Sequence, residues 1–221
     1  MRPNPACLLL LLAALPAWGQ TDNRLFVRPW VELEPLVRIE GGQYPIPLEK
    51  AERTLLEEAR VLLSGMVYGW SFDYTPANSA RGVAESFTLT PIAQIQWGNA
   101  RLKVVETETK DQKLWARASY TMDEAEAARR ASWESSTAAL SQGEGKASVM
   151  KGPEAKGLSF QDAVRDAIRN SLHGTYIDAP RQIVGDVVLW ESPESSVRSG
   201  VYRTTAKVKI MVRNVVPYRI F

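Results

Sequence analysis

Residues 159–174 read SFQDAVRDAIRNSLHG, and residues 202–213 read YRTTAKVKIMVR. In the first stretch apolar residues recur every three or four positions, which predicts an amphipathic helix with Ser159 as its N-cap. In the second stretch apolar or small residues alternate with basic ones, which predicts an antiparallel strand with one solvated face. Residues 183–190 predict another strand before it, and residues 192–200 a polar connection.

A similar order of elements occurs earlier in the chain. The apolar spacing from Leu48 to Leu63 predicts an amphipathic helix that ends near Gly65, and residues 102–109 and 113–122 predict a hairpin. The fold class is therefore predicted to be α+β, with two related helix-plus-antiparallel-strand units whose helices pack on one face of the sheet or sheets. Whether the two sheets pack against each other or continue into each other stays open.

The composition along the chain suggests where the units begin and end. Residues 141–157 contain four glycines and one proline, which is typical of a flexible linker, and Asp123 is a suitable cap for a helix running to about Leu140. The predicted segments are a signal peptide at 1–19, an extended piece at 20–45, a first unit with a trailing helix at 46–140, a linker at 141–157 and a second unit at 158–221.

The N-terminus has the features of a secretory signal. Met1 and Arg2 precede an apolar run at residues 8–15, and small residues follow, so cleavage is expected near Gly19. The apolar run is too short to span a bilayer, although an uncleaved anchor is the alternative. The protein is therefore expected to be exported and to be periplasmic or associated with the cell envelope.

Charge and cysteine content limit the partners. The chain has 27 basic and 25 acidic residues, and removal of residues 1–19 takes away Arg2 and the only cysteine, Cys7. The mature chain would then be nearly neutral, so neither nucleic acid nor an acidic membrane surface is an expected partner. It could form no internal disulfide, and no later segment has the length of a membrane helix.

An aromatic run follows the first predicted helix. Tyr68, Trp70, Phe72 and Tyr74 alternate with small or polar residues, so a strand would place all four rings on one face. Such a face could be a stacking platform that binds sugars or flat ligands. Alternatively, the rings cover the underside of a helix, because aromatic side chains supply much of the area that ordinary cores bury.

Few residues suggest catalytic or metal chemistry. The single histidine, His173, has no nucleophile and acid that the sequence places beside it, and a histidine near a helix C-terminus is a favourable charge there. Glu106, Glu108 and Asp111 could hold an oxygen-ligand metal, but carboxylates on an exposed face are usually solvated. No phosphate-binding loop is present. The sequence therefore predicts no enzyme, no metal site and no cofactor.

The arrangement of a helix followed by hairpin strands, with helix residues such as Ala163, Arg165, Ala167 and Leu172, resembles the small α+β modules of LPP20-like and flagellar T-ring assembly proteins. That resemblance implies a non-catalytic protein of the bacterial envelope and no particular binding residues. We therefore expect an exported, non-catalytic protein that acts through contact with a protein partner in the envelope. The alternative is a ligand- or glycan-binding protein that uses the aromatic strand at residues 68–74.

Overall fold

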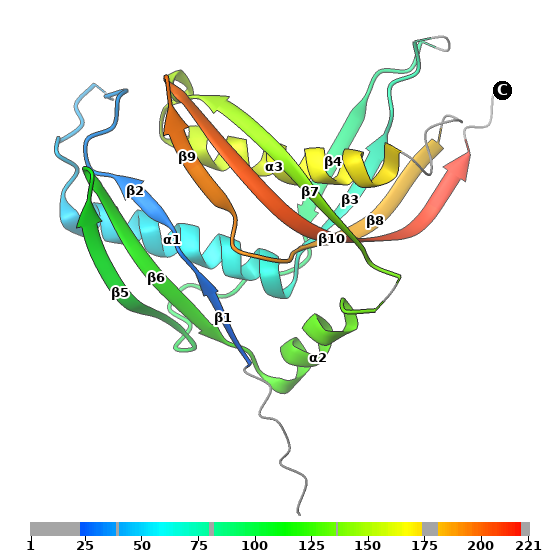
Figure 1. The fold of residues 1–221 in the computed structure, drawn as a ribbon, viewed down its shortest axis with the longest axis horizontal. Coiled ribbons are helices and arrows are strands. Elements are labelled where there is room, and N and C mark those ends of the chain that lie inside the picture. The colour runs from blue at the N-terminus through cyan, green and yellow to red at the C-terminus, as the bar shows by residue number, and fades with distance from the viewer. Residues whose placement is uncertain (1–22, 39, 80–81, 136, 174–180, 218–221) are drawn as a thin grey trace, which may run out of the picture.

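The computed structural model describes residues 23–38, 40–79, 82–135, 137–173 and 181–217. The predicted signal segment lies outside them. The described residues form three α-helices and ten strands in two antiparallel sheets, so the predicted α+β class is confirmed (Figure 1). The α-helices are α1 (Leu48–Val67), α2 (Glu124–Ser132) and α3 (Ala155–His173).

The smaller sheet has four strands. Strand β6 (Lys113–Thr121) lies between β5 (Leu102–Lys110) on one side and β1 (Arg24–Val27) and β2 (Trp30–Glu32) on the other. The predicted hairpin is confirmed as β5 and β6, and its turn residues Asp111 and Gln112 both have positive φ. Proline lacks the N–H that a ladder needs, and the extended N-terminal piece accordingly divides into β1 and β2 around Pro29.

The larger sheet has six strands and draws on both predicted units. Its main order is β4 (Ser86–Pro91), β3 (Trp70–Thr75), β8 (Arg181–Leu189), β10 (Val201–Pro217) and β7 (Ala139–Ser148). Strand β9 (Glu194–Arg198) also pairs with β10. Of the two arrangements that the sequence left open, strands of the first and the second unit therefore continue into one sheet.

The prediction of a flexible linker at residues 141–157 is wrong. This segment supplies most of β7, the 3₁₀ helix η2 (Val149–Glu154) and the start of α3. A Cβ atom on Gly143 or Gly145 would overlap the backbone of α3, at Ala167 for the first glycine and at Ser159 for the second. These glycines allow a helix and a strand to approach closely, and their role is not to make the chain flexible.

Other element boundaries differ from the predictions as well. Helix α3 begins at Ala155, just after Pro153, so Ser159 is not its N-cap. The Ser159 hydroxyl instead donates to the Lys156 carbonyl oxygen at 2.8 Å and hydrogen-bonds to the Thr204 hydroxyl at 2.7 Å. The predicted polar connection at 192–200 contains β9. The helix capped by Asp123 ends at Ser132 and does not reach residue 140.

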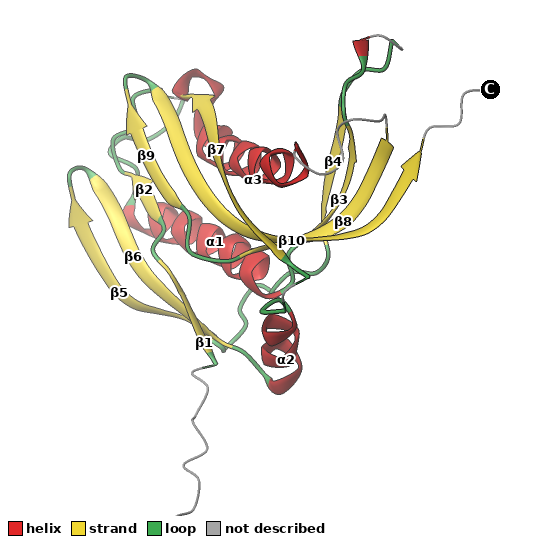
Figure 2. Ribbon diagram, turned by 45° about the vertical axis from the view of Figure 1, so that its right-hand side comes forward, coloured by secondary structure: helices red, strands yellow, loops and turns green. Residues whose placement is uncertain are grey.

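The main hydrophobic core lies between the two sheets. Helix α1 lies between them, and α1 and α3 pack on the same face of the six-stranded sheet (Figure 2). The predicted stripe of α3 is confirmed, because it is buried at every position: Phe160, Ala163, Val164, Ala167, Ile168 and Leu172. The alternating face of β10 is also buried from Tyr202 to Ile210. Burial of these faces is the main stabilising contribution to the fold.

Helix α2 is fixed to the smaller sheet by one buried carboxylate. Asp123 caps the helix in a capping box with Glu126, as the sequence predicts for the cap. Glu126 also accepts hydrogen bonds from the hydroxyls of Tyr68 and Tyr120, the second at 2.9 Å, and forms an ion pair with Arg101 at 2.7 Å. Burial and the hydrogen bond to Glu126 raise the pKa of Tyr120.

Arg130 fixes the other side of α2 to the six-stranded sheet and α1. Its guanidinium group donates to the carbonyl oxygens of Met66 at 3.0 Å, Leu189 at 2.8 Å and Trp190 at 2.5 Å. It also lies 3.9 Å from the centre of the Trp190 ring system. Burial lowers the pKa of Arg130 to about 10. One side chain thus joins three elements of the fold.

Candidate functional site

The four aromatic residues at 68–74 belong to the core. Trp70, Phe72 and Tyr74 are only 8%, 2% and 5% exposed, and they form part of the main core cluster. Tyr68 is half-buried, and its hydroxyl donates to Glu126. A sugar-stacking platform needs exposed ring faces, so these four residues do not form one. Their role is the packing that the second interpretation of the sequence describes.

The other residues singled out in the sequence are not gathered together. His173 is exposed at the C-terminal end of α3. Glu106 and Glu108 lie on β5, where Glu108 is 3.6 Å from Arg28, and Asp111 lies in the hairpin turn. Within the described ranges, no group of three or more His, Cys, Asp or Glu side chains could hold a metal ion.

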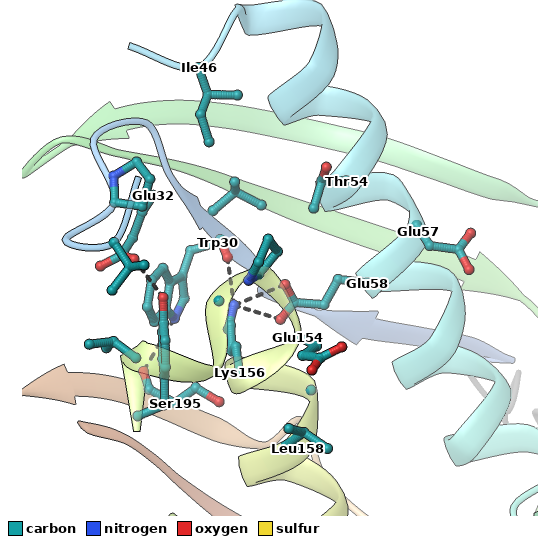
Figure 3. A pocket seen from close by; sticks show the side chains of 18 of the residues that line it. Trp30, Glu32, Ile46, Thr54, Glu57, Glu58, Glu154, Lys156, Leu158 and Ser195 are labelled. Atoms are coloured by element: carbon teal, nitrogen blue, oxygen red, sulfur yellow. Dashed lines mark hydrogen bonds and ion pairs between the residues drawn. The ribbon is translucent and has the colours of Figure 1, made fainter. Parts of the chain in front are cut away.

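The structure contains a cavity of about 810 Å³ that the sequence did not predict (Figure 3). Its walls come from α1, residues 35–37 and 40–46 in the segment that follows β2, η2 with the start of α3, and the β9–β10 hairpin. This volume is within the range of sites that hold small ligands or side chains of a partner. Most of its lining is apolar, including Val31, Val37, Ile46, Leu62 and Phe160.

Trp30 lies almost fully buried at the base of this cavity. Its side chain is 3% exposed and lies 6.2 Å, ring centre to ring centre, from Tyr202 and 5.8 Å from Trp115. Its indole N–H donates to the Ser195 carbonyl oxygen at 3.2 Å, which fixes the ring orientation. Because Trp30 belongs to β2, the smaller sheet and the β9–β10 hairpin meet at this point.

A partly buried ion pair lies beside this ring. Lys156 contacts Glu58 at 2.7 Å and donates to the Trp30 carbonyl oxygen at 2.5 Å (Figure 3). Its ammonium nitrogen also lies 4.0 Å from the centre of the Trp30 ring system. Burial raises the pKa of Glu58 and lowers that of Lys156, while the attraction between the two groups opposes both shifts. The pair links α1 to α3 across the cavity wall.

The mouth of the cavity carries both apolar and charged groups. Leu36, from the segment after β2, is 69% exposed, and Val61, from α1, is 37% exposed. Five glutamates and two lysines line the cavity, and Tyr202 donates to one of these glutamates, Glu32, at 2.5 Å. Burial and this hydrogen bond raise the pKa of Tyr202. The site can therefore hold an apolar group and contact polar groups around it.

Sequence reasoning missed the residues of this cavity. Lys156 lies in the stretch that was predicted as a linker, and Trp30 lies in a short piece predicted only as extended. One signal in the sequence does indicate that α3 begins before Ser159. Small residues lie four positions apart at 155, 159, 163 and 167. That spacing extends the helix face back past Lys156. No comparable signal marks Trp30.

Replacing Lys156 with methionine should lower the free energy of unfolding by about 2 kcal/mol. The change leaves the Glu58 carboxylate without its partner and the Trp30 carbonyl without its donor. The value is reduced from that of a fully buried pair because the two side chains are 15% and 25% exposed. Urea denaturation of the wild type and the variant would measure it.

The double variant Lys156→Met/Glu58→Leu provides the control. Removal of both charges leaves no unpaired ion, so most of the lost stability should return. If the double variant is as unstable as the sum of the single variants, the two residues do not act as a pair. In that case the cost of Lys156→Met comes from lost packing alone.

Within the described residues, no helix combines the length and apolar character that crossing a bilayer requires. No solved structure matches the chain. An uncharacterized protein of Treponema pallidum (strain Nichols) is 27% identical over 194 residues, which cover 87% of this chain and 81% of that protein. One protein-family model matches residues 17–218, and since the match covers most of the chain, the protein belongs to that family.

Proposed function

We propose that this chain is an exported, non-catalytic protein of the cell envelope that works by binding a segment of another protein in the cavity beside Trp30. The observation that supports this function is the cavity of about 810 Å³, whose mouth exposes Leu36 and Val61. Exposed apolar side chains at the edge of a cavity are typical of sites where protein partners bind.

The chemistry of the lining suggests how a partner segment would bind. An apolar side chain of the partner would enter between α1 and residues 35–37 and 40–46 and approach Trp30. The ion pair of Lys156 and Glu58 holds α1 and α3 in place before binding, so little ordering is needed. The glutamates around the cavity would contact polar groups at the ends of the segment.

Photo-cross-linking in cells tests this function. A benzoylphenylalanine placed at position 36 or 61 should capture the same protein, because both side chains line the cavity mouth. Leu140 is the control position, since it is 62% exposed on β7 and does not line the cavity. Capture of no protein at positions 36 and 61, or equal capture at 140, would contradict the proposal.

A charge in the cavity wall gives a second test of the same site. Val61→Arg should reduce recovery of the captured partner about tenfold or more, because burying an unpaired guanidinium against an apolar segment is costly. Val61 is partly exposed, so the melting temperature should change little. Leu140→Arg should change neither quantity. Unchanged recovery with Val61→Arg would exclude the cavity as the binding site.

A further inference from the structure

In the ranges that the structure describes, the outer edge of the six-stranded sheet at β7 is covered by a helix, whereas the outer edge of the four-stranded sheet at β5 is not. Helix α3 closes the outer edge of β7: the backbone N–H of Glu144 donates to Asp166 at 2.9 Å, and the Asn170 amide donates to the Gln142 carbonyl oxygen at 3.0 Å. The backbone N–H of Lys146 likewise donates to the Asp162 carboxylate at 3.3 Å. Blocking an edge in this way prevents another strand from pairing with it.

The outer edge of β5 has no such cover. Within the part of the chain that the structure describes, no side chain hydrogen-bonds to the outer backbone edge of residues 103–110. Every residue from Lys103 to Lys110 is exposed, and Val104 and Val105 are 43% and 55% exposed. Strand β4 is also an edge, but it is shorter and ends at Pro91. Among the described strands, β5 therefore has the longest open edge, and it adds almost nothing to the core.

A bulge in β5 determines which residues share a face. Val104 lies opposite Ala118 and Thr107 lies opposite Ala116, while Val105 between them has no partner on β6. Both alanines are buried on the face of the sheet that packs against α1, so Val104 and Thr107 point to that same face. Lys103 and Glu108 point to the opposite face, because side chains alternate along a strand.

This pattern makes β5 complementary to itself. Suppose that β5 of a second copy lies antiparallel to β5 of the first, with Thr107 of the second opposite Val104 of the first. Glu108 of the second copy then lies opposite Lys103 of the first, and Thr109 of the second lies opposite Leu102 of the first. In each of these pairs both residues point to the same face, and the twofold symmetry forms every pair twice. The two Lys103–Glu108 pairs join opposite charges, and Val104 lies opposite Thr107 on either side of the two central Val105–Glu106 pairs.

We propose that β5 pairs with β5 of a second copy, so that two four-stranded sheets join edge to edge in a symmetric dimer. The occupant of the open edge is this chain itself, because in this register opposite charges lie opposite each other on the same face. The dimer leaves the cavity beside Trp30 open, since β5 does not line it. The proposal is independent of the function proposed for the cavity.

Sedimentation velocity of the purified protein across micromolar concentrations tests the dimer. The wild type should show a reversible monomer–dimer equilibrium. Lys103→Glu should weaken the dimer about tenfold, because it places like charges opposite each other twice. Glu108→Lys should do the same, and the charge-swapped double variant should restore the dimer. A monomeric wild type, or a dimer that neither reversal weakens, would overturn the proposal.

Engineered disulfides test the register itself. In a Cys7→Ser background, Val104→Cys/Thr107→Cys should form a covalent dimer on mild oxidation, because the two positions would lie opposite each other in different copies. Val104→Cys alone is the matched control, since the two copies of residue 104 would be about 10 Å apart. Cross-linking of the single variant as readily as the double would overturn this register.

Discussion

Replacing Gly145 with alanine is expected to lower the free energy of unfolding by about 3 kcal/mol or more. The new methyl group would overlap the Ser159 carbonyl oxygen and the Ala163 amide nitrogen, which belong to the backbone of α3. A side chain could rotate away, but a helix backbone cannot, so α3 must move off β7. Because α3 also packs on the main core, this movement would open buried contacts. Thermal and urea denaturation would measure the loss.

Gly157→Ala provides the matched control for this prediction. Gly157 is in the first part of α3, and a Cβ atom there would meet no other atom within 4 Å. Alanine favours the helix over glycine, so this variant should be more stable by about 0.5 kcal/mol. If Gly145→Ala and Gly157→Ala had similar effects, close packing of α3 on β7 would not be the reason for the glycine.

Replacing Arg130 with methionine should cost about 3 kcal/mol of unfolding free energy. Three carbonyl oxygens, those of Met66, Leu189 and Trp190, would lose their donor, and the Trp190 ring would lose the cation above it. Methionine keeps much of the side-chain volume, so the effect would report lost hydrogen bonds more than a cavity. The midpoint of urea denaturation would show the change.

The neighbouring arginine separates this effect from a general loss of charge. Arg129 donates only to the Tyr68 carbonyl oxygen, at 3.2 Å, and its buried Nε atom has no partner. Arg129→Met should therefore cost about 1 kcal/mol. Arg130→Lys should recover part of the stability, because an ammonium group can reach some of the carbonyls. Equal losses for the two methionine variants would show that the network at Arg130 has no special importance.

Local patterns predicted most elements because they depend on neighbours in the sequence. The stripe of α3, the alternation in β10 and the β5–β6 hairpin all follow from local patterns, and each is confirmed. The fold class follows from the order of these elements. Residues 141–157 were harder to interpret, because four glycines and one proline are typical of a linker.

Contacts between distant residues could not be predicted in the same way. Gly143 and Gly145 are typical of a linker until α3 is seen to lie on them, and β3 gives no sign that it pairs with β8. The cavity depends on four segments that meet only in the folded chain, so neither Trp30 nor Lys156 could be identified as part of it. The aromatic strand had two interpretations because periodicity shows which rings share a face but not what covers that face.

The pairing of β3 with β8 affects how the chain folds. Trp70 lies opposite Val187, so a central part of the six-stranded sheet joins residues that are far apart in the sequence. Pairing of this kind raises the contact order, so we expect slow folding, because a long loop must close before the strands gain from pairing. Until residues 181–217 have been synthesised, one edge of β3 stays open. If the proposed export is correct, this delay would leave the chain time to cross a membrane before it folds.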